Sequence, residues 1–244
     1  MKKNMIRPLL ASLSLAFAAT AAQAQVPVLG IAGTWSNVVG GGGTVNGIGT
    51  NVVNWGTGLT QSGYTFLAST PVAISPLLVN TQFSLGKFTH RNFPINAGTS
   101  ITAARLNFSL TLDPAAAPNV FSQSFEFDHF ETVNSDNPCA DGGANFVGVN
   151  INGCADRVRY SFLGGIANSF TFGGTTYFLE VLGFERSGQA FTEFWTAETV
   201  ANDAELIGRL TTEDPSTVVP EPASVALLGA GLVGLAGIAR RRRA

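Results

Sequence analysis

The chain has 244 residues and a formal net charge of only −2, but its charges are unevenly distributed. Residues 25–219 contain 7 basic and 15 acidic side chains, so this part alone carries a net charge of −8. An acidic surface of this kind argues against nucleic acid as a partner, because phosphate binding needs clustered Lys and Arg. The same window is long enough for one domain with a substantial hydrophobic core.

The first 24 residues have the pattern of a secretory signal peptide. Lys2, Lys3 and Arg7 form a basic start, and an apolar stretch runs from Leu9 to Ala22. Ala22-Gln23-Ala24 then provides the small residues of a cleavage site, which predicts Gln25 as the mature N-terminus. An uncleaved N-terminal anchor is the alternative, but the apolar stretch is short for a membrane span.

Residues 25–212 are predicted to form an all-β ectodomain, an antiparallel β-sandwich with a jelly-roll-like arrangement. Short apolar runs with alternating polarity are separated by Gly, Asn and Pro, which favours strands over helices. The clearest strand is 104–112, where Leu106, Phe108 and Leu110 share one face. The glycine run 40–43 is predicted to be a flexible loop. The predicted strands are 31–37, 51–55, 64–68, 81–90, 104–112, 120–132, 158–162, 170–172, 176–184, 190–197 and 205–211.

The segment Thr89-His90-Arg91-Asn92-Phe93-Pro94-Ile95 is predicted to form a corner between two strands. Asn92 suits a turn, and the residue before Pro94 is held in an extended conformation. His90 would then fix the corner by a hydrogen bond to a loop carbonyl. The alternative makes His90 a metal ligand or a general base.

The predicted strand 120–132 places Glu126 and Asp128 on one face and His129 on the other, together with phenylalanines. The two carboxyls would lie roughly 7 Å apart along the strand, a separation that inverting glycosidases also use. A solvated acidic face explains the same pattern without a cleft, and it is favoured because the two side chains would lie side by side rather than across a substrate. His129 is predicted to be a partly buried, hydrogen-bonded residue.

Cys139 and Cys154 are the only cysteines, and the export signal places both in an oxidising compartment. We therefore predict a disulfide that closes a loop rich in Gly, Asn and Asp. The oxygen-bearing side chains in this loop leave calcium binding open, although their spacing matches neither an EF-hand nor a nonapeptide repeat. No catalytic residue and no transition-metal site is predicted. The oxygen-bearing residues are Asn134, Asp136, Asn137, Asp141, Asn150, Asn152 and Asp156.

A three-part pattern fills the end of the chain after a short tether at residues 213–219. Pro220, Glu221 and Pro222 are followed by an uncharged apolar stretch at 223–239, which we predict to be a transmembrane helix. Arg240, Arg241, Arg242 and Arg243 come next, and a cluster of this kind stays on the cytoplasmic side. The preceding domain would therefore face away from the cytoplasm, in the periplasm.

The terminal pattern in residues 220–244 resembles the PEP-CTERM sorting signal of Gram-negative bacteria. That resemblance implies an exosortase-type processing enzyme and the inner membrane as partners during sorting. It also implies that the processed protein goes on to the cell surface or the extracellular matrix. Thr89, His90, Asn92 and Pro94 resemble the signature of the Thr-His-x-Asn subfamily of PEP-CTERM proteins and of related choice-of-anchor ectodomains. Those families have no established catalytic role, so the resemblance assigns no chemistry to these four residues.

PEP-CTERM proteins accompany exopolysaccharide production, which implies a non-enzymatic structural or adhesive role at the surface or in biofilm. A carbohydrate-binding module is the alternative, supported by Trp35, Trp55, Trp195 and Tyr64 if their rings are exposed. A glycan-active enzyme is the third possibility.

Overall fold

A computed structural model describes residues 25–70, 77–117, 119–163 and 168–213, and the described residues are almost entirely β-structure. Two short 3₁₀ turns, η1 (Gly41–Gly43) and η2 (Gly148–Asn150), lie between strands. The strands are β1 (Gln25–Val26), β2 (Val28–Gly40), β3 (Val52–Trp55), β4 (Ser62–Ala68), β5 (Leu77–Leu78), β6 (Gln82–Asn92), β7 (Ile101–Leu112), β8 (Val120–Phe130), β9 (Asp156–Leu163), β10 (Asn168–Phe172), β11 (Thr175–Arg186), β12 (Gln189–Phe191), β13 (Glu193–Thr196) and β14 (Val200–Thr211).

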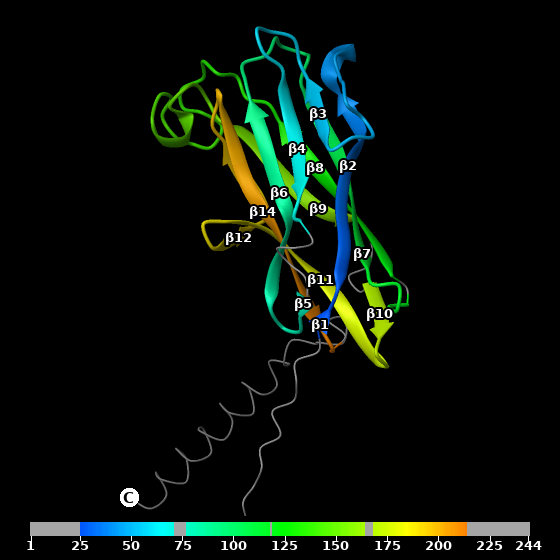
Figure 1. The fold of residues 1–244 in the computed structure, drawn as a ribbon. Coiled ribbons are helices and arrows are strands. Elements are labelled where there is room, and N and C mark those ends of the chain that lie inside the picture. Colours follow the sequence, from blue (N-terminus) through cyan, green and yellow to red (C-terminus); the bar gives the residue numbers. More distant parts are fainter. Residues whose placement is uncertain (1–24, 71–76, 118, 164–167, 214–244) are drawn as a thin grey trace, which may run out of the picture.

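The named strands pair in antiparallel fashion and form two large sheets packed face to face (Figure 1). One sheet has the order β10-β11-β14-β6-β4-β3, with β12 added beside β11. The other has the order β13-β9-β8-β7-β2. A small third sheet pairs β1 with β5. The prediction of an antiparallel all-β fold is therefore confirmed.

The strand order corrects the jelly-roll part of the prediction. Strands β7, β8 and β9 follow one another in the chain and are also neighbours in the same sheet. This is a three-strand meander within one sheet, whereas a jelly roll is built from two Greek keys whose strands are shared between both sheets. A short connection joins β7 to β8, whereas the segment 131–155, which carries the disulfide, joins β8 to β9.

Aromatic rings from both sheets fill the space between them. Trp35 of β2 contacts Phe127 of β8 and Tyr64 of β4, with ring centroids 5.1 and 5.2 Å apart. Phe88 of β6 stacks against Phe127 at 5.0 Å, so the two sheets meet through aromatic contacts. All four rings are fully buried. Burial of one such side chain stabilises the fold by roughly 1.5–3 kcal/mol, and the alternation along each strand is what places them inside.

The two ends of the sandwich differ in what they hold. The C-terminal end of β6 and the N-terminal end of β14 meet where Asn92 pairs with Val200, at the upper end in Figure 1. The segment between β8 and β9, which contains both cysteines, lies at this same end. β14 finishes at the opposite end beside β11, where Thr211 pairs with Phe178. We call these the loop end and the exit end.

The glycine run forms an ordered turn rather than a flexible loop. Gly40 has φ 90°, and a Cβ atom there would lie 2.8 Å from the Ser100 carbonyl oxygen. The Gly41 amide donates to that same oxygen at 2.8 Å. Close approach to a neighbouring strand, not chain freedom, therefore explains the glycine at position 40.

The predicted signal peptide at 1–24, the transmembrane span at 223–239 and most of the tether lie outside the described residues. Within the part of the chain that the structure does describe, no helix has the length and apolar character needed to cross a membrane.

Candidate functional site: a buried polar cluster at the loop end

The candidate site begins where the aromatic core ends, on strands β6 and β8. Alternation along β6 turns Thr89 and Arg91 outward and His90 and Asn92 inward. On β8 the inward position after Phe127 is His129. His90 and His129 are the only histidines of the chain, and both are buried. Two strands from opposite sheets thus deliver both imidazoles into the interior.

The two imidazole rings lie next to each other and are surrounded by aromatic side chains. Their centroids are 5.2 Å apart, with the planes nearly perpendicular. Trp55 lies 5.8 Å from His90 and 5.2 Å from His129. Tyr64 contacts the same pair at 5.0 and 5.7 Å. These contacts restrict both imidazoles, so their nitrogens point in defined directions.

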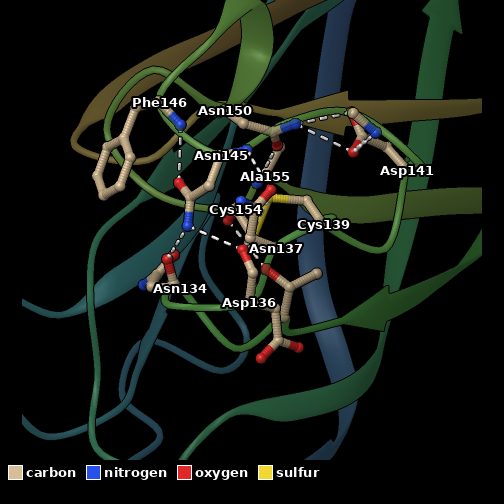
Figure 2. Close-up of a disulfide and its surroundings, with 12 residues drawn as sticks. Asn134, Asp136, Asn137, Cys139, Asp141, Asn145, Phe146, Asn150, Cys154 and Ala155 are labelled. Carbon is tan, nitrogen blue, oxygen red and sulfur yellow. Dashed lines mark hydrogen bonds between the residues drawn. A yellow bond between two sulfur atoms is a disulfide. The ribbon is translucent and has the colours of Figure 1, made fainter.

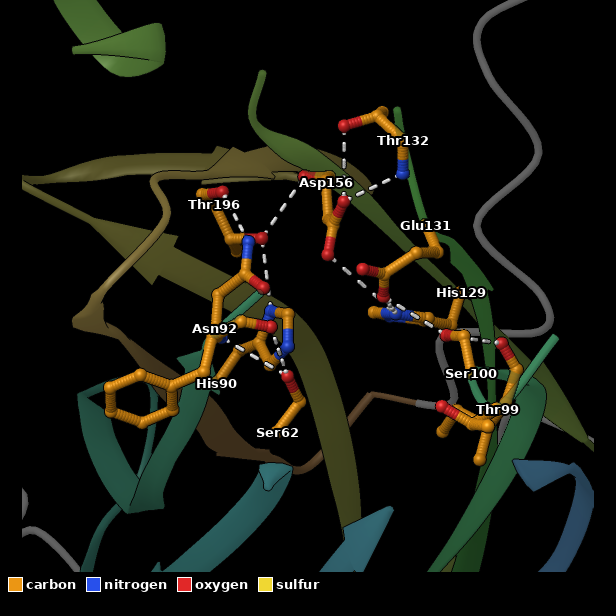
Figure 3. Close-up of polar contacts among 12 residues, drawn as sticks. Ser62, His90, Asn92, Thr99, Ser100, His129, Glu131, Thr132, Asp156 and Thr196 are labelled. Atoms are coloured by element: carbon orange, nitrogen blue, oxygen red, sulfur yellow. Dashed lines mark hydrogen bonds and ion pairs between the residues drawn. The ribbon is translucent and has the colours of Figure 1, made fainter. Parts of the chain in front are cut away.

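Three carboxylates reach the same region from three separate segments. Glu131 follows β8, Asp156 opens β9, and Glu198 lies between β13 and β14. Asp156 and Glu198 are fully buried, and the Glu131 side chain is 20% exposed. The His129 Nε2 atom lies 3.4 Å from Glu131 Oε2 and 3.9 Å from Asp156 Oδ2 (Figure 3).

The buried carboxyls have shifted proton affinities. Burial, reinforced by the charge of Glu131, raises the pKa of Asp156 to about 9. Burial and then the same neighbour raise the pKa of Glu198 to about 7. Burial also holds the pKa of His90 well below its usual value, with His129 as the next cause. Across the described residues, no Lys or Arg forms an ion pair with Glu131, Asp156 or Glu198.

The hydrogen bonds around Thr196 fix the tautomer of His90. The Thr196 hydroxyl donates to the main-chain oxygen of Asp156 at 3.0 Å, so its proton is already committed. His90 Nδ1 lies 2.9 Å from that hydroxyl oxygen and must therefore be the donor. In the neutral imidazole, His90 Nε2 therefore carries a lone pair and no proton. This nitrogen has no hydrogen-bond partner.

Other atoms of the cluster lack partners as well. Asp156 Oδ1 accepts from the Thr132 amide at 2.8 Å and from its hydroxyl at 3.2 Å, but Oδ2 is unpaired. Glu198 Oε2 is buried and unpaired too. Buried polar atoms nearly always have a partner, so three in one cluster need an explanation. Donor atoms from His90, His129 and Asp156 lie within 4.8 Å of one another, as do those from Glu131, Asp156 and Glu198.

A pocket opens beside the cluster. It has a volume of about 500 Å³ and lies between the segment that follows β6 and the segment that follows β8. Glu131 belongs both to the pocket wall and to the cluster, and Ser100 in that wall donates to Glu131 Oε2 at 3.0 Å. The pocket is lined by Pro94, Ile95, Asn96, Ala97, Gly98, Ser100, Glu131, Thr132, Val133 and Asn134.

The predicted disulfide between Cys139 and Cys154 is present, with Cα atoms 5.3 Å apart (Figure 2). The Asn145 amide donates to the main-chain oxygens of Asn134 and Asp136 at 2.8 and 2.9 Å. Asn150 donates to both oxygens of the Asp141 carboxylate at 3.0 Å. Amide side chains therefore organise the interior of this loop.

Only Asp156 among the oxygen-bearing residues of the loop joins the buried cluster. Thr132 links the two regions, because its hydroxyl bonds both Asp156 and the Cys154 carbonyl oxygen. With its amide nitrogen turned toward Glu198, Asn134 donates to Oε1 at 3.2 Å and to the Cys154 carbonyl oxygen at 3.0 Å. The loop and the cluster thus share hydrogen bonds as well as position.

The predicted corner at Thr89–Pro94 is wrong. Thr89, His90 and Asn92 lie within β6, which pairs with β14 and β4 on its two sides, and only Pro94 follows the strand. Pairing of Asn92 with Val200 of β14 outweighs its local turn preference. His90 bonds the Thr196 hydroxyl rather than a loop carbonyl, and Asn92 donates to the Thr196 main-chain oxygen at 3.0 Å.

The acidic pair on β8 lies on the outer face, as the solvated alternative expected. Asp128 is exposed, and Glu126 pairs with Arg105 of β7 at 3.0 Å. His129 lies on the inward face with Phe127 and is buried, as predicted.

Of the four aromatic residues considered for sugar binding, Trp35, Trp55 and Tyr64 are fully buried, and Trp195 is half-buried. The first three therefore offer no exposed stacking surface.

The sequence did not reveal the cluster, because its members come from four segments that are distant in the chain. One signal was available. The only two histidines both occupy inward positions of alternating strands, each two residues beyond a buried phenylalanine. A buried histidine needs polar partners, so this coincidence pointed to a polar interior at one end.

Comparison with known families gives one match, and it lies outside the sandwich. Residues 218–243 match the PEP-CTERM protein-sorting motif. A search of curated proteins finds no match to the chain. The Thr-His-x-Asn and choice-of-anchor resemblances thus remain predictions. The matched range contains Pro220, Glu221, Pro222 and the four arginines. The motif marks the chain as an exported protein that an exosortase processes and sorts to the cell surface.

Proposed function

We propose that the protein is a non-enzymatic structural or adhesive component of the cell surface or extracellular matrix, associated with exopolysaccharide. The arrangement of the two ends of the sandwich supports this role. The chain leaves β14 at the exit end and continues toward the sorting motif at 218–243. The disulfide loop lies at the opposite end, which an attached or matrix-bound protein would present to its surroundings.

The observation that carries the adhesive role is the exposed apolar surface of that loop. Phe146 is 68% exposed and lies away from the disulfide (Figure 2). Val133, Val147 and Ile151 are also more than half exposed. The disulfide and the amide bonds hold the loop in one conformation, so a partner meets apolar groups that are already ordered.

Co-sedimentation with exopolysaccharide from the producing cells tests this role. Exchange of Phe146 and Ile151 for serine should weaken retention of the exported protein at least fivefold, because their apolar contacts are lost. Val120 is 51% exposed on β8 near the exit end, so Val120→Ser is the matched control and should bind normally. Equal retention of both variants would contradict adhesion through the loop.

A carbohydrate-binding module is the second candidate, and the pocket favours it. Glu131, Asn96 and Asn134 line this cavity of about 500 Å³, and carboxylate and amide groups are good partners for sugar hydroxyls. A glycan array with and without calcium would distinguish the two roles. Binding of one defined oligosaccharide that Asn96→Ala abolishes would favour the pocket over the loop.

Before processing, we propose that residues 223–239 hold the protein in the inner membrane with the sandwich in the periplasm. The apolar stretch and the following arginine cluster support this orientation. Replacement of Arg240–Arg243 by serine should slow processing and surface delivery, as measured by pulse-chase fractionation. Unchanged processing in that variant would count against the proposed orientation.

A further inference from the structure

We propose that His90, His129, Asp156 and Glu131 bind one divalent transition-metal ion of the zinc type. The inference is independent of the adhesive role, because the cluster lies inside the sandwich and the proposed contact surface lies on the loop. Convergence of the four side chains alone would not suffice. The decisive feature is a fully buried imidazole nitrogen with no hydrogen-bond partner, on a residue that has a ligand atom within 4.8 Å of ligand atoms of His129 and Asp156.

That nitrogen is His90 Nε2. The chain of bonds from His90 Nδ1 through the Thr196 hydroxyl to the Asp156 carbonyl leaves Nε2 without a proton. A buried lone pair without a donor is unfavourable unless it binds a proton or a cation. The arrangement is also the one that metal-binding histidines use, since the distal ring nitrogen donates a hydrogen bond that orients the ring.

The other three residues bring their donor atoms together around His129 Nε2. His129 is held through Nδ1 by the Tyr64 hydroxyl at 2.8 Å, so its Nε2 is directed toward Glu131 and Asp156. Asp156 uses Oδ1 for its two bonds to Thr132 and keeps Oδ2 unpaired. His90, His129 and Asp156 therefore each have one atom held by the surrounding protein and another that can bind a metal, while Glu131 Oε2 also accepts from Ser100 (Figure 3).

Charge balance supports a dication. Asp156 and Glu131 together supply two negative charges, and no Lys or Arg among the described residues pairs with either. A divalent ion would make the four-ligand site electrically neutral, which matters in an interior that screens charge poorly. Glu198 lies within reach of Asp156 and Glu131 but is not needed for this balance.

The mixture of nitrogen and oxygen ligands selects the class of metal. Calcium and magnesium prefer oxygen ligands throughout, whereas imidazole suits zinc, iron, nickel and copper. Bonds of about 2.1 Å in tetrahedral geometry place ligand atoms roughly 3.4 Å apart. The His129–Glu131 distance of 3.4 Å already meets that value, and the His129–Asp156 distance of 3.9 Å needs a small contraction.

Zinc titration of the full-length chain, purified without a polyhistidine tag and stripped with chelator, tests the site. We expect uptake of one Zn²⁺ per chain and a rise in melting temperature of at least about 5 °C at saturating zinc. Co²⁺ in place of Zn²⁺ should give visible absorption bands typical of coordination by nitrogen and oxygen.

Asp156→Asn is the informative variant, because an amide oxygen can keep both bonds to Thr132 while the charge is lost. It should fold and bind zinc at least 100-fold more weakly, as should His90→Gln. The matched control is Glu126→Gln, which removes a carboxylate from the outer face of β8 and should bind zinc normally. Absence of zinc uptake by the natural chain, equal affinity of Asp156→Asn and Glu126→Gln, or stabilisation by Ca²⁺ alone would each overturn the proposal.

Discussion

Strands β6 and β8 lie in opposite sheets and face each other across the interior. Two consecutive inward positions on each strand have very different surroundings. Phe88 and Phe127 stack at 5.0 Å in a dry aromatic core. Two residues further along the same strands, His90 and His129 lie 5.2 Å apart among carboxylates and unpaired polar atoms. We call the first pair, Phe88 and Phe127, the aromatic level and the second pair, His90 and His129, the polar level. The backbone geometry is the same at both levels. Side-chain chemistry alone therefore turns one level into stabilising core and the other into a candidate binding site.

The largest expected effect comes from the aromatic level. Phe127 is fully buried and contacts Trp35, Phe88 and Phe184 from both sheets. Phe127→Ala should lower the free energy of unfolding by about 3–5 kcal/mol, because it leaves a cavity that rigid neighbouring rings cannot fill. Chemical denaturation of the chelator-treated protein measures this loss. A cost below about 1 kcal/mol would mean that the two levels do not differ as described.

The second effect concerns the loop that covers the polar level. Exchange of Cys139 and Cys154 for serine opens a loop with a sequence separation of 15 residues. The expected loss is about 3 kcal/mol, because the unfolded chain regains the freedom that the disulfide removes. The far-UV circular dichroism spectrum should stay β-rich, since no strand lies between the cysteines. Two free thiols in protein isolated from the periplasm would contradict the disulfide.

Most strands could be predicted from the sequence, and the polar cluster could not, for the same physical reason. Alternation is a local property, so residues 104–112 and 120–132 indicated strands close to β7 and β8 without any knowledge of their neighbours. The cluster depends on which strands pair. Asp156 reaches His129 because β9 pairs with β8, and Thr196 reaches His90 because β13 joins the far edge of β9.

The sorting signal and the disulfide were accessible for a different reason. Each rests on a few residues whose chemistry has few alternative uses, namely two exported cysteines and a proline-bounded apolar stretch before four arginines. Asn92 and Pro94 were misleading. When the pairing of a strand is unknown, the sequence does not show whether a turn-forming residue ends the strand or lies within it. Pairing of Asn92 with Val200 decided the matter, and no local pattern encodes that partner.

The third prediction is a pH dependence confined to the polar level in the metal-free protein. Asp156 has a raised pKa of about 9 and Glu198 one of about 7, so the folded state holds protons that the unfolded state releases. Their contribution to stability is therefore present at low pH and is lost as the pH rises through these values. The lowered pKa of His90 acts in the opposite direction below its unfolded value near 6.5, which leaves pH 6.5–9 as the window.

Across that window we expect the melting temperature of chelator-treated protein to fall by on the order of 5 °C. The groups that face Asp156 and Glu198 are Glu131, His90, His129 and Tyr64. Asp156→Asn should flatten much of the slope, because it removes the carboxyl with the largest shift. Glu126→Gln on the outer face should leave the slope unchanged. A melting temperature independent of pH in the natural chain would show that the buried carboxyls are compensated in another way.

The smallest expected change in stability comes from making the two levels alike. His90→Phe repeats Phe88 at the next inward position and keeps the ring contacts with Trp55 and Tyr64. It removes the bond to Thr196, but the Thr196 hydroxyl still donates to the Asp156 carbonyl, and the unpaired Nε2 disappears. Exchange of a poorly satisfied polar group for an apolar one of similar shape is often nearly neutral, so the chelator-treated variant should unfold within about 1 kcal/mol of the natural chain. Zinc should separate the two proteins, raising the melting temperature of the natural chain and leaving that of His90→Phe unchanged. A variant that loses several kcal/mol without metal would instead mean that His90 belongs to the stabilising core, and the contrast between neighbouring positions on β6 would then be one of shape rather than of chemistry.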